Sequence, residues 1–367
     1  MLIAIDGNEA NIPQRVGVNQ VAFELLRQLA AKDWGHDFVV FLKDRPLPDM
    51  PAPSTHFRYE VFGPKRAWVL TGLSLRLFRS PRPQVLFSPS HYIPLISPVK
   101  RIFTIMDLSY EKFGQQYFRP YDLKQLRLWT RRSAAVAHKI ITISQSAKED
   151  IISYYHFPAE RISVIYPGYN QSLYHPRIPL TKQQQIRDKY GIKGKFFLYL
   201  GTLQPRKNIV RLIQAFSKLG GGTKLVIVGK KGWLYDEILS LAVKLKISQK
   251  VIFTGFVQNE DLPALYKACV AYVLPSLYEG FGMPVIEAQA CGAITIVSAV
   301  SSLPEIAGKG AIYIKNPEKI HSIAEALRSS LSLPQKKRQQ LLLQNKQNLT
   351  RFSWELSASS LIAALTG

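Results

Sequence analysis

The hydrophobic residues of this chain gather in short runs of strand length, which alternate with longer segments of helical periodicity. Parallel sheets are built from strand–helix–strand units, so this alternation predicts an α/β fold. In the first half we expect strands at 3–6, 38–43, 57–62, 85–88, 102–108, 139–143 and 162–166, and helices near 19–31, 66–78, 121–137 and from a capping box at Ser146. After proline-containing stretches at 167–168 and 174–180 the pattern restarts, with strands expected at 196–200, 225–228, 251–253, 272–274, 294–297 and 311–314.

The restart predicts two parallel-sheet domains, at 1–175 and 176–350, followed by an amphipathic segment at 351–367. A length of 367 residues is enough for two domains with full cores. Ligands of parallel α/β sheets bind outside the carboxyl ends of the strands. We therefore expect a ligand in a cleft between the two domains.

The stretch Tyr278–Glu287 carries the strongest chemical signal. It follows an apolar run and is expected to open a helix, whose free N–H groups would favour an anion. Gly280 and Gly282 let the backbone approach a ligand closely. Glu279 and, in the expected first helical turn, Glu287 are carboxylates beside this anion site, and such carboxylates usually hold hydroxyls. The combination suggests a sugar nucleotide.

The loop Gly201–Asn208 also joins a predicted strand to a predicted helix, with Asn208 as the expected N-cap. Arg206 and Lys207 would then project from a helix N-terminus. Arginine offers phosphate a two-pronged contact and lysine a point charge, so together they could neutralise a departing diphosphate. The alternative is an ordinary solvated basic turn.

The charge of the chain is far from neutral, since 48 Lys and Arg against 25 Asp and Glu give +23. Such a charge implies an anionic partner: nucleic acid, an anionic membrane surface or phosphorylated ligands. The positive charge is diffuse and no nucleic-acid-binding signature is present, so nucleic acid is not the expected partner. The two cysteines, Cys269 and Cys291, are expected in the core of a protein from a reducing compartment. No metal-ligand spacing, signal peptide or membrane-spanning run is evident.

Weaker signals lie in the first half. The loop that contains Gly17 either brings N–H groups to a phosphate or is an ordinary turn. His91 follows a predicted strand and faces the expected cleft, although a lone histidine is more often structural. Basic and aromatic residues cluster at 65–82 and 117–132, which suits an anionic membrane surface. The alternative for both clusters is a solvated helix face with its aromatic residues in the core.

These motifs resemble those of the family 4 glycosyltransferases, a retaining group with the GT-B fold that includes bacterial mannosyl- and glucosyltransferases. The resemblance covers nearly the whole chain and is carried by Glu279–Glu287, Gly201–Asn208, Val164–Gly168, Ile141–Ser146 and Ser302–Ile306. It implies two Rossmann-like domains facing across a cleft, the first for an acceptor and the second for a nucleotide sugar. It also implies that the last helix crosses back to the first domain.

The resemblance implies roles for individual residues. Arg206 and Lys207 would hold the donor diphosphate, Glu287 the ribose and Glu279 the transferred sugar. Further donor contacts would come from Gly17, Val257, Gly280, Phe281 and Gly282. No metal or other cofactor is implied. The family commonly has His-Asp-Leu where this chain has Met106-Asp107-Leu108, so Met106, Asp107 and His91 are the candidates on the sugar and acceptor side. Many members also have arginine where Thr202 stands.

The resulting hypothesis is a retaining transfer of a hexosyl group, mannosyl as first choice, from a nucleoside diphosphate sugar to a saccharide acceptor. A polyprenyl-diphosphate-linked acceptor is expected, at the cytoplasmic face of the inner membrane in surface polysaccharide synthesis. Three alternatives remain: a sugar-nucleotide epimerase of the same fold, a pseudoenzyme that binds the donor without transfer, and a basic nucleic-acid-binding protein.

Overall fold

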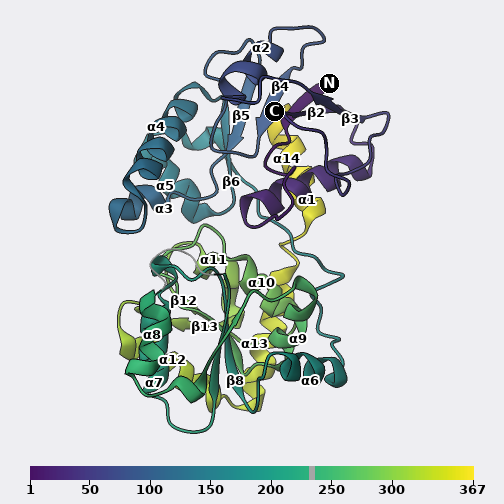
Figure 1. The fold of residues 1–367 in the computed structure, drawn as a ribbon. Helices are drawn as coiled ribbons and strands as arrows, with labels where there is room; N and C mark the ends of the chain where they lie inside the picture. The colour runs from purple at the N-terminus through teal and green to yellow at the C-terminus, as the bar shows by residue number, and fades with distance from the viewer. Residues whose placement is uncertain (231–235) are drawn as a thin grey trace. The chain divides into compact units, whose positions relative to one another are not determined.

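The computed structural model of the chain describes residues 1–230 and 236–367, and these divide into two compact units (Figure 1). The first unit is Met1–Gly168 together with Phe352–Gly367, and the second is Tyr169–Arg351. Each unit holds one parallel sheet, as the alternating sequence pattern predicts.

The sheet of the first unit has seven parallel strands in the order β3-β2-β1-β4-β5-β6-β7. The strands are β1 (Leu2–Asp6), β2 (Asp37–Leu42), β3 (Phe57–Val61), β4 (Val85–Ser88), β5 (Lys100–Thr104), β6 (Lys139–Thr142) and β7 (Ile162–Val164). The helices are α1 (Val18–Ala31), η1 (Val69–Leu73), α2 (Ser74–Arg76), α3 (Ser109–Phe113), η2 (Gly114–Gln116), α4 (Pro120–Val136), α5 (Gln145–Tyr155), η3 (Ala159–Arg161) and α14 (Trp354–Thr366). The strand order reverses between β1 and β4, whose apolar residues are buried.

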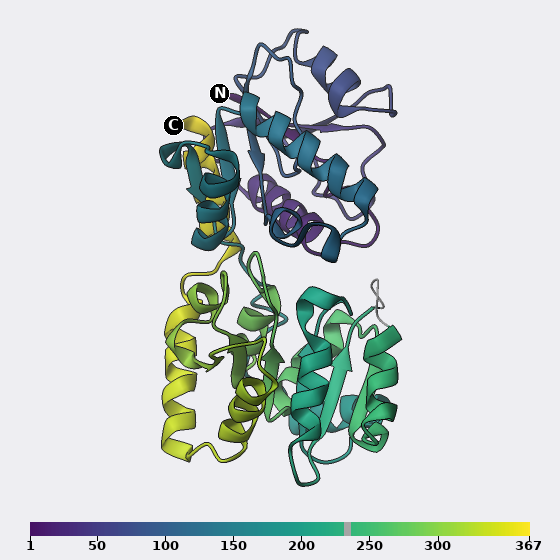
Figure 2. The same cartoon turned by 90° about the vertical axis from the view of Figure 1, so that its left-hand side faces the viewer.

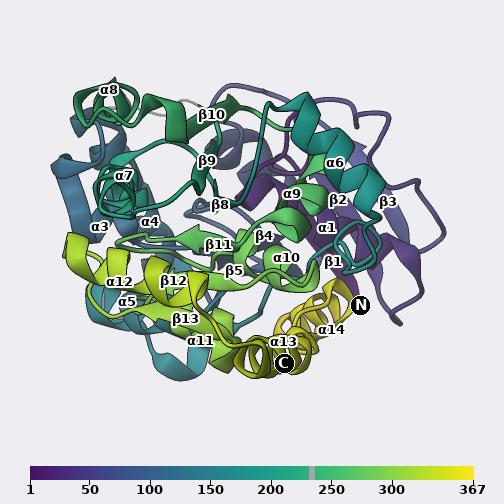
Figure 3. The same cartoon turned by 90° about the horizontal axis from the view of Figure 1, so that it is seen from below.

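The sheet of the second unit has six parallel strands in the order β10-β9-β8-β11-β12-β13, with its reversal between β8 and β11. The strands are β8 (Phe196–Leu200), β9 (Lys224–Val228), β10 (Val251–Gly255), β11 (Ala271–Leu274), β12 (Thr295–Ser298) and β13 (Ala311–Ile314). The helices are α6 (Leu180–Lys189), η4 (Pro205–Lys207), α7 (Ile209–Ser217), α8 (Asp236–Lys244), η5 (Ser248–Lys250), η6 (Asn259–Asp261), α9 (Leu262–Ala268), α10 (Met283–Ala290), α11 (Leu303–Ala307), η7 (Gly308–Gly310), α12 (Ile320–Leu331) and α13 (Gln335–Leu349). Helices cover both faces of this sheet, with α7, α8 and α12 on one side and α6, α9, α10 and α13 on the other (Figures 1 and 3). Because both faces are covered, its strands are almost uniformly apolar.

The last helix of the chain belongs to the first unit, where Figure 2 shows it in yellow among the purple and teal elements. The α14 helix packs against α1, and its N-cap Ser353 accepts a hydrogen bond from the Leu356 N–H at 3.1 Å. The hydroxyl of Ser357 donates to the carbonyl of Tyr166 at 2.6 Å. Residues far apart in the sequence therefore build one core.

Three local predictions differ from the structure. The cap of α5 is Ser144, which accepts from the Ala147 N–H, so the predicted capping box at Ser146 is wrong by two positions. The strand expected over 102–108 ends at Thr104, and the helix expected over 66–78 is confined to 69–76. Among the described residues, no helix is both long and apolar enough to cross a bilayer.

Candidate active site

Two loops of the second unit lie at the point where its strand order reverses. One follows β8 and carries Arg206 and Lys207, and the other follows β11 and carries Glu279. In a parallel sheet the loops that leave two strands on either side of such a reversal diverge to opposite faces and leave room for a ligand. The two strongest sequence motifs therefore lie together at the point of the sheet where α/β proteins usually bind their ligand.

The loop after β8 is placed by a close backbone approach to β9. A Cβ added at Gly229, which follows β9, would lie 1.9 Å from the carbonyl oxygen of Gly201. Gly201 itself donates its N–H to Val228 at 3.0 Å, and the Gly229 N–H goes to Gly255 at 3.0 Å. A residue with a side chain at Gly229 would therefore push the loop away from the sheet.

We expect Gly229→Ala to lower the free energy of unfolding by about 1–3 kcal/mol, as overpacking a tight contact does. The measurement is urea unfolding followed by circular dichroism. Gly220→Ala is the matched control, because a Cβ there meets nothing within 4 Å. Equal stability of the two variants would contradict the packing argument.

Asn208 holds the end of the same loop in an unexpected way. It has a left-handed backbone, with φ of 61°, and its side chain makes no cap hydrogen bond to α7. Instead its Nδ2 donates to the carbonyls of Pro275 at 2.9 Å and Pro317 at 2.7 Å. Asn208 is therefore the N-cap residue of α7, as predicted, but its side chain caps no N–H and instead ties the loop after β8 to the loop after β11.

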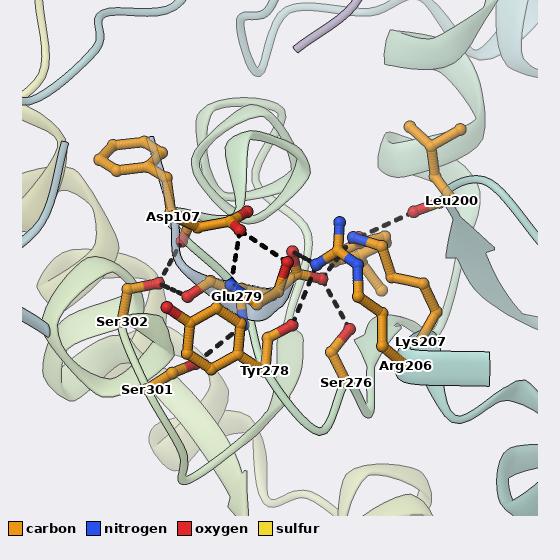
Figure 4. Close-up of polar contacts among 12 residues, drawn as sticks. Asp107, Leu200, Arg206, Lys207, Ser276, Tyr278, Glu279, Ser301 and Ser302 are labelled. Atoms are coloured by element: carbon orange, nitrogen blue, oxygen red, sulfur yellow. Dashed lines mark hydrogen bonds and ion pairs between the residues drawn. The ribbon is translucent and has the colours of Figure 1, made fainter. Parts of the chain in front are cut away.

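Glu279 lies where these loops meet, with only 6% of its surface exposed (Figure 4). Lys207 Nζ lies 2.5 Å from its Oε1, and Arg206 Nη1 lies 3.4 Å from its Oε2. The hydroxyl of Ser276 also donates to Oε1, at 2.7 Å. The structure therefore brings Arg206, Lys207 and Glu279 into one buried ion-pair cluster.

The charges of this cluster do not cancel. Burial raises the pKa of the Glu279 carboxyl, but Lys207 and Arg206 outweigh that effect and the pKa ends below its ordinary value. Glu279 is thus ionised at neutral pH, and two cations face one anion. The surplus positive charge suits a group that gains negative charge as it departs.

Two serines fix the backbone of the Glu279 loop, and the sequence analysis did not select them as site residues. Ser301 Oγ accepts the Glu279 N–H at 2.9 Å. Ser302 Oγ lies 2.9 Å from the Glu279 carbonyl oxygen and 3.1 Å from that of Phe281. Ser302 opens one of the motifs used for the family resemblance, which was the signal available.

Glu287 lies on α10, which begins at Met283 and places Glu287 in the second helical turn rather than the predicted first. Tyr266 Oη lies 3.2 Å from the Glu287 Oε2. Burial raises the pKa of Glu287 to about 7, with the Tyr266 hydrogen bond acting against that rise. Within residues 1–230 and 236–367 no basic side chain forms an ion pair with Glu287, whereas Lys207 and Arg206 pair with Glu279.

The two residues that follow β10, Phe256 and Val257, differ in exposure. Val257 is 2% exposed, whereas the preceding Phe256 is 53% exposed. Lys230, which follows β9, places its Nζ 4.8 Å from the centre of the Phe256 ring. The sequence analysis did not select Phe256, but of these two side chains it is the one that is exposed and able to contact a ligand.

The remaining candidates lie in the first unit. Gly17 is the exposed N-cap of α1, with nothing within 4 Å of an added Cβ. The His91 ring packs edge-on against Tyr110, and burial lowers the pKa of His91 while nearby Asp107 opposes that shift. Asp107 Oδ1 also accepts from the N–H of Ser109, the first residue of α3, at 3.0 Å. None of these contacts tests the roles predicted for Gly17, His91 and Asp107, so those roles stay predictions.

The surroundings of Met106 differ from those of His91 and Asp107. Its side chain lines a small apolar space, together with Val21 and Leu25 of α1 and Trp354 of α14.

The two glycines of the donor motif, Gly280 and Gly282, remain in the loop of Glu279, where Gly282 has φ of 101° and caps α10. Across 1–230 and 236–367, no three His, Cys, Asp or Glu side chains converge as metal ligands.

Both halves of the chain match known families. Residues 16–173 match the family described as Glycosyltransferase Family 4, and residues 182–348 match the family described as Glycosyl transferases group 1. The O-antigen chain mannosyltransferase B of Escherichia coli is 30% identical over 313 residues, which cover 83% of this chain and 78% of that protein. The O-antigen chain mannosyltransferase RfbU of Salmonella typhimurium is 28% identical over 266 residues, or 71% and 69% of the two chains. The serotype-specific mannosyltransferase WbdA of Escherichia coli is 34% identical over 226 residues, but this chain spans only 27% of its length.

Solved structures of similar fold cover the whole chain. Anabaena Alr3699/HepE in complex with UDP-glucose has a TM-score of 0.77 at 18% identity and covers 100% of this chain and 99% of its own. WaaG, a glycosyltransferase involved in lipopolysaccharide biosynthesis, has a TM-score of 0.72 at 19% identity and covers 100% of both chains. At these identities the likeness concerns the fold alone.

Proposed function

This chain belongs to the GT-B glycosyltransferases whose halves match Glycosyltransferase Family 4 and group 1, and from that premise we propose that it is a retaining mannosyltransferase. Its donor is a nucleoside diphosphate sugar and its acceptor a saccharide. The observation that carries the proposal is the buried cluster in which Lys207 and Arg206 flank Glu279 at 2.5 and 3.4 Å. Such a cluster offers positive charge to a diphosphate and a carboxylate to a sugar.

In the proposed reaction the bond between the anomeric carbon and the diphosphate oxygen breaks, and the diphosphate leaves with the electron pair. Arg206 and Lys207 stabilise the negative charge that develops on it. Glu279 accepts hydrogen bonds from the sugar and holds it in place. The acceptor hydroxyl attacks the same face, and a donor phosphate oxygen takes its proton, so no protein nucleophile is needed.

The rest of the donor has matching groups in the same unit. Glu287 accepts hydrogen bonds from the ribose hydroxyls, and the N–H groups of Gly280, Phe281 and Gly282 approach the sugar or phosphate. The base lies near Val257, where the exposed Phe256 ring offers it a flat apolar face. The proposed donor needs no metal.

The choice of mannose rests on the relatives that carry that activity in their names. The proposed acceptor is a growing saccharide on a polyprenyl diphosphate, in surface polysaccharide synthesis. A thermal-shift series with UDP, GDP and their sugars tests the donor, and product analysis with and without acceptor tests the reaction. Stabilisation by no nucleotide would contradict the proposal, donor isomerisation without acceptor would favour an epimerase, and binding without any turnover would favour a pseudoenzyme.

We also propose that the first unit docks on an anionic membrane surface. A groove of about 780 Å³ along α4 is lined by Lys124, Arg127, Arg131 and Arg132, and by Glu111, which pairs with Arg127 at 2.8 Å. Exposed apolar side chains lie on the same helix, namely Tyr121 at 72% and Leu128 at 40%. The second basic and aromatic cluster, at 65–82, also exposes Leu75 at 59% and Phe78 at 49%. We propose that this surface holds the chain at the cytoplasmic face of the inner membrane.

We expect the chain to float with vesicles that contain phosphatidylglycerol and not with neutral phosphatidylcholine vesicles. Each cation near the surface contributes on the order of 1 kcal/mol, so Lys124→Glu with Arg132→Glu should weaken vesicle binding at least tenfold. The matched control is Lys193→Glu with Lys336→Glu, which reverses two exposed lysines of the second unit. Equal binding to both vesicle types would contradict the membrane proposal.

A further inference from the structure

Glu287 has one close neighbour to which the proposed reaction gives no part, the side chain of Tyr266 on α9. The Tyr266 hydroxyl donates to Glu287 Oε2 at 3.2 Å. Tyr266 is fully buried, whereas Glu287 is partly exposed. A ligand can therefore reach the carboxylate but not the tyrosine, which approaches the carboxylate from the core.

The Tyr266 ring is held by two other aromatic side chains of the same unit. It packs edge-on against Tyr272 of β11, with the ring centres 5.5 Å apart, and against Tyr174, with the ring centres 6.2 Å apart. The Tyr272 hydroxyl points to a different partner, since it donates to the carbonyl of Leu200 at 3.3 Å. Burial raises the pKa of Tyr266 well above its ordinary value, so its hydroxyl remains a donor throughout the neutral pH range.

The groups around Glu287 supply no positive charge. Its titratable neighbours are uncharged at neutral pH, namely Tyr174, Tyr266, Tyr272 and Cys291. Two charged side chains act on these neighbours, Glu260 on Tyr174 and Lys267 on Cys291. Among the residues that the structure describes, no charged side chain of α11, α13, β11 or β12 acts on Glu287. Burial, which raises the pKa of Glu287, is therefore opposed by the Tyr266 hydrogen bond.

The same hydrogen bond leaves room for a ligand on the carboxylate. A carboxylate has about four acceptor positions, and Tyr266 fills one of those on Glu287. The neighbouring 2′- and 3′-hydroxyls of a ribose can fill two more. Hydroxyl groups bind an ionised carboxylate more strongly than a neutral one. Binding of the ribose should therefore depend on Glu287 being ionised.

We propose that Tyr266 is a positioning residue for the donor: its hydroxyl holds Glu287 from the core side and keeps that carboxylate ionised and open to the ribose hydroxyls. The inference rests on the proposed function, in which Glu287 binds the ribose. Tyr266→Phe removes one oxygen and keeps the ring, so burial is left unopposed and Glu287 ionises at a higher pH. Donor binding then weakens near neutral pH and recovers at high pH, which a purely structural role of Tyr266 would not produce.

The first test is calorimetric titration at pH 6 and pH 9 with GDP or UDP, whichever binds the wild type more tightly. Tyr266→Phe should raise the Kd at least about tenfold at pH 6 and no more than about twofold at pH 9, because a hydrogen bond to a charged group shifts an ionisation by about 1–2 pH units. Ionisation of the nucleotide itself is the same for every variant and cancels in the ratio. Tyr272→Phe is the matched control, because it removes a buried hydroxyl that is bonded to Leu200 instead. Its ratio to the wild type should not change with pH.

The second test measures the ionisation of Glu287 without any nucleotide. In protein labelled with carbon-13 glutamate, the side-chain carboxyl signal of Glu287 is the one that disappears in Glu287→Gln. It should titrate at about 7 in the wild type and about 1–2 pH units higher in Tyr266→Phe. Unfolding temperatures of all variants show that each is folded.

The inference is overturned if Tyr266→Phe weakens nucleotide binding by the same factor at both pH values, or if its Glu287 signal titrates as in the wild type. Either result leaves the transferase proposal standing. A wild type that binds neither nucleotide removes the transferase proposal, and the carbon-13 titration still decides whether Tyr266 keeps Glu287 ionised. The 2′,3′-dideoxy nucleotide lacks both hydroxyls, so it should bind the wild type and Tyr266→Phe equally. A difference there would mean that Tyr266 acts on another part of the nucleotide, against the inference.

Discussion

Replacing Lys207 with alanine is expected to lower kcat by about two to three orders of magnitude, the usual effect of removing one donor that stabilises developing charge. Lys207 is one of the two cations that contact Glu279, and 14% of its side chain is exposed. Its loss leaves Arg206 to meet the departing diphosphate alone. Because the charge on the diphosphate grows as the bond breaks, kcat should fall more than KM rises.

The same substitution should leave the fold intact, since Glu279 keeps Arg206 at 3.4 Å and Ser276 at 2.7 Å. Steady-state kinetics with the donor sugar measure the effect, and thermal unfolding serves as the control for folding. Lys193→Ala removes an exposed lysine of the same unit and should keep wild-type turnover. Glu279→Ala should also lower turnover by orders of magnitude. Near wild-type rates in both Lys207→Ala and Glu279→Ala would sink the assigned roles.

The architecture was predictable because parallel strands are buried on both faces and are therefore written in the sequence as apolar runs. The run at 196–200, for example, matches β8 residue for residue, and the strand order then follows the rules of α/β folds. The local boundaries were less predictable, since a helix start depends on which of several serines reaches the right N–H. Ser144 and Ser146 are chemically alike, and only the backbone of β6 and its turn decides that Ser144 caps α5.

Some residues of the candidate site were also predictable from the sequence, and others were not. Glu279, Arg206 and Lys207 were found because each lies in a loop between a predicted strand and a predicted helix, where the free N–H groups of the helix favour an anion. Ser301 and Ser302 escaped selection because their contacts to the Glu279 backbone depend on the packing of α11 against α10. Asn208 was assigned a cap from its position, whereas its side chain bridges carbonyls at 275 and 317, which are distant in sequence.

Replacing Glu287 with glutamine is expected to stabilise the free protein and weaken its donor binding at the same time. Burial raises the pKa of Glu287 from 4.5 to about 7 in the folded protein. The folded protein therefore holds this proton more tightly than the unfolded chain does, and stability is lost as pH rises from about 4.5 through about 7. Above that window the loss is complete and amounts to about 3 kcal/mol.

Glutamine does not ionise, so Glu287→Gln should exceed the wild type in free energy of unfolding by that amount at pH 8 and equal it near pH 4. Asp6, whose pKa burial also raises to about 6, titrates in both proteins and cancels in the difference. Urea unfolding at the two pH values measures the stability, and calorimetry with the nucleoside diphosphate measures binding. A hydrogen bond from a ribose hydroxyl to a carboxylate contributes about 1.5–3 kcal/mol, so affinity should fall about tenfold to a hundredfold. A variant that is more stable at pH 8 yet binds the nucleotide as tightly as the wild type would show that Glu287 is a buried carboxyl without a part in donor binding. A buried carboxyl that lowers the stability of the fold and takes no part in binding would have no evident use, so stability and nucleotide affinity have to be measured on the same variant.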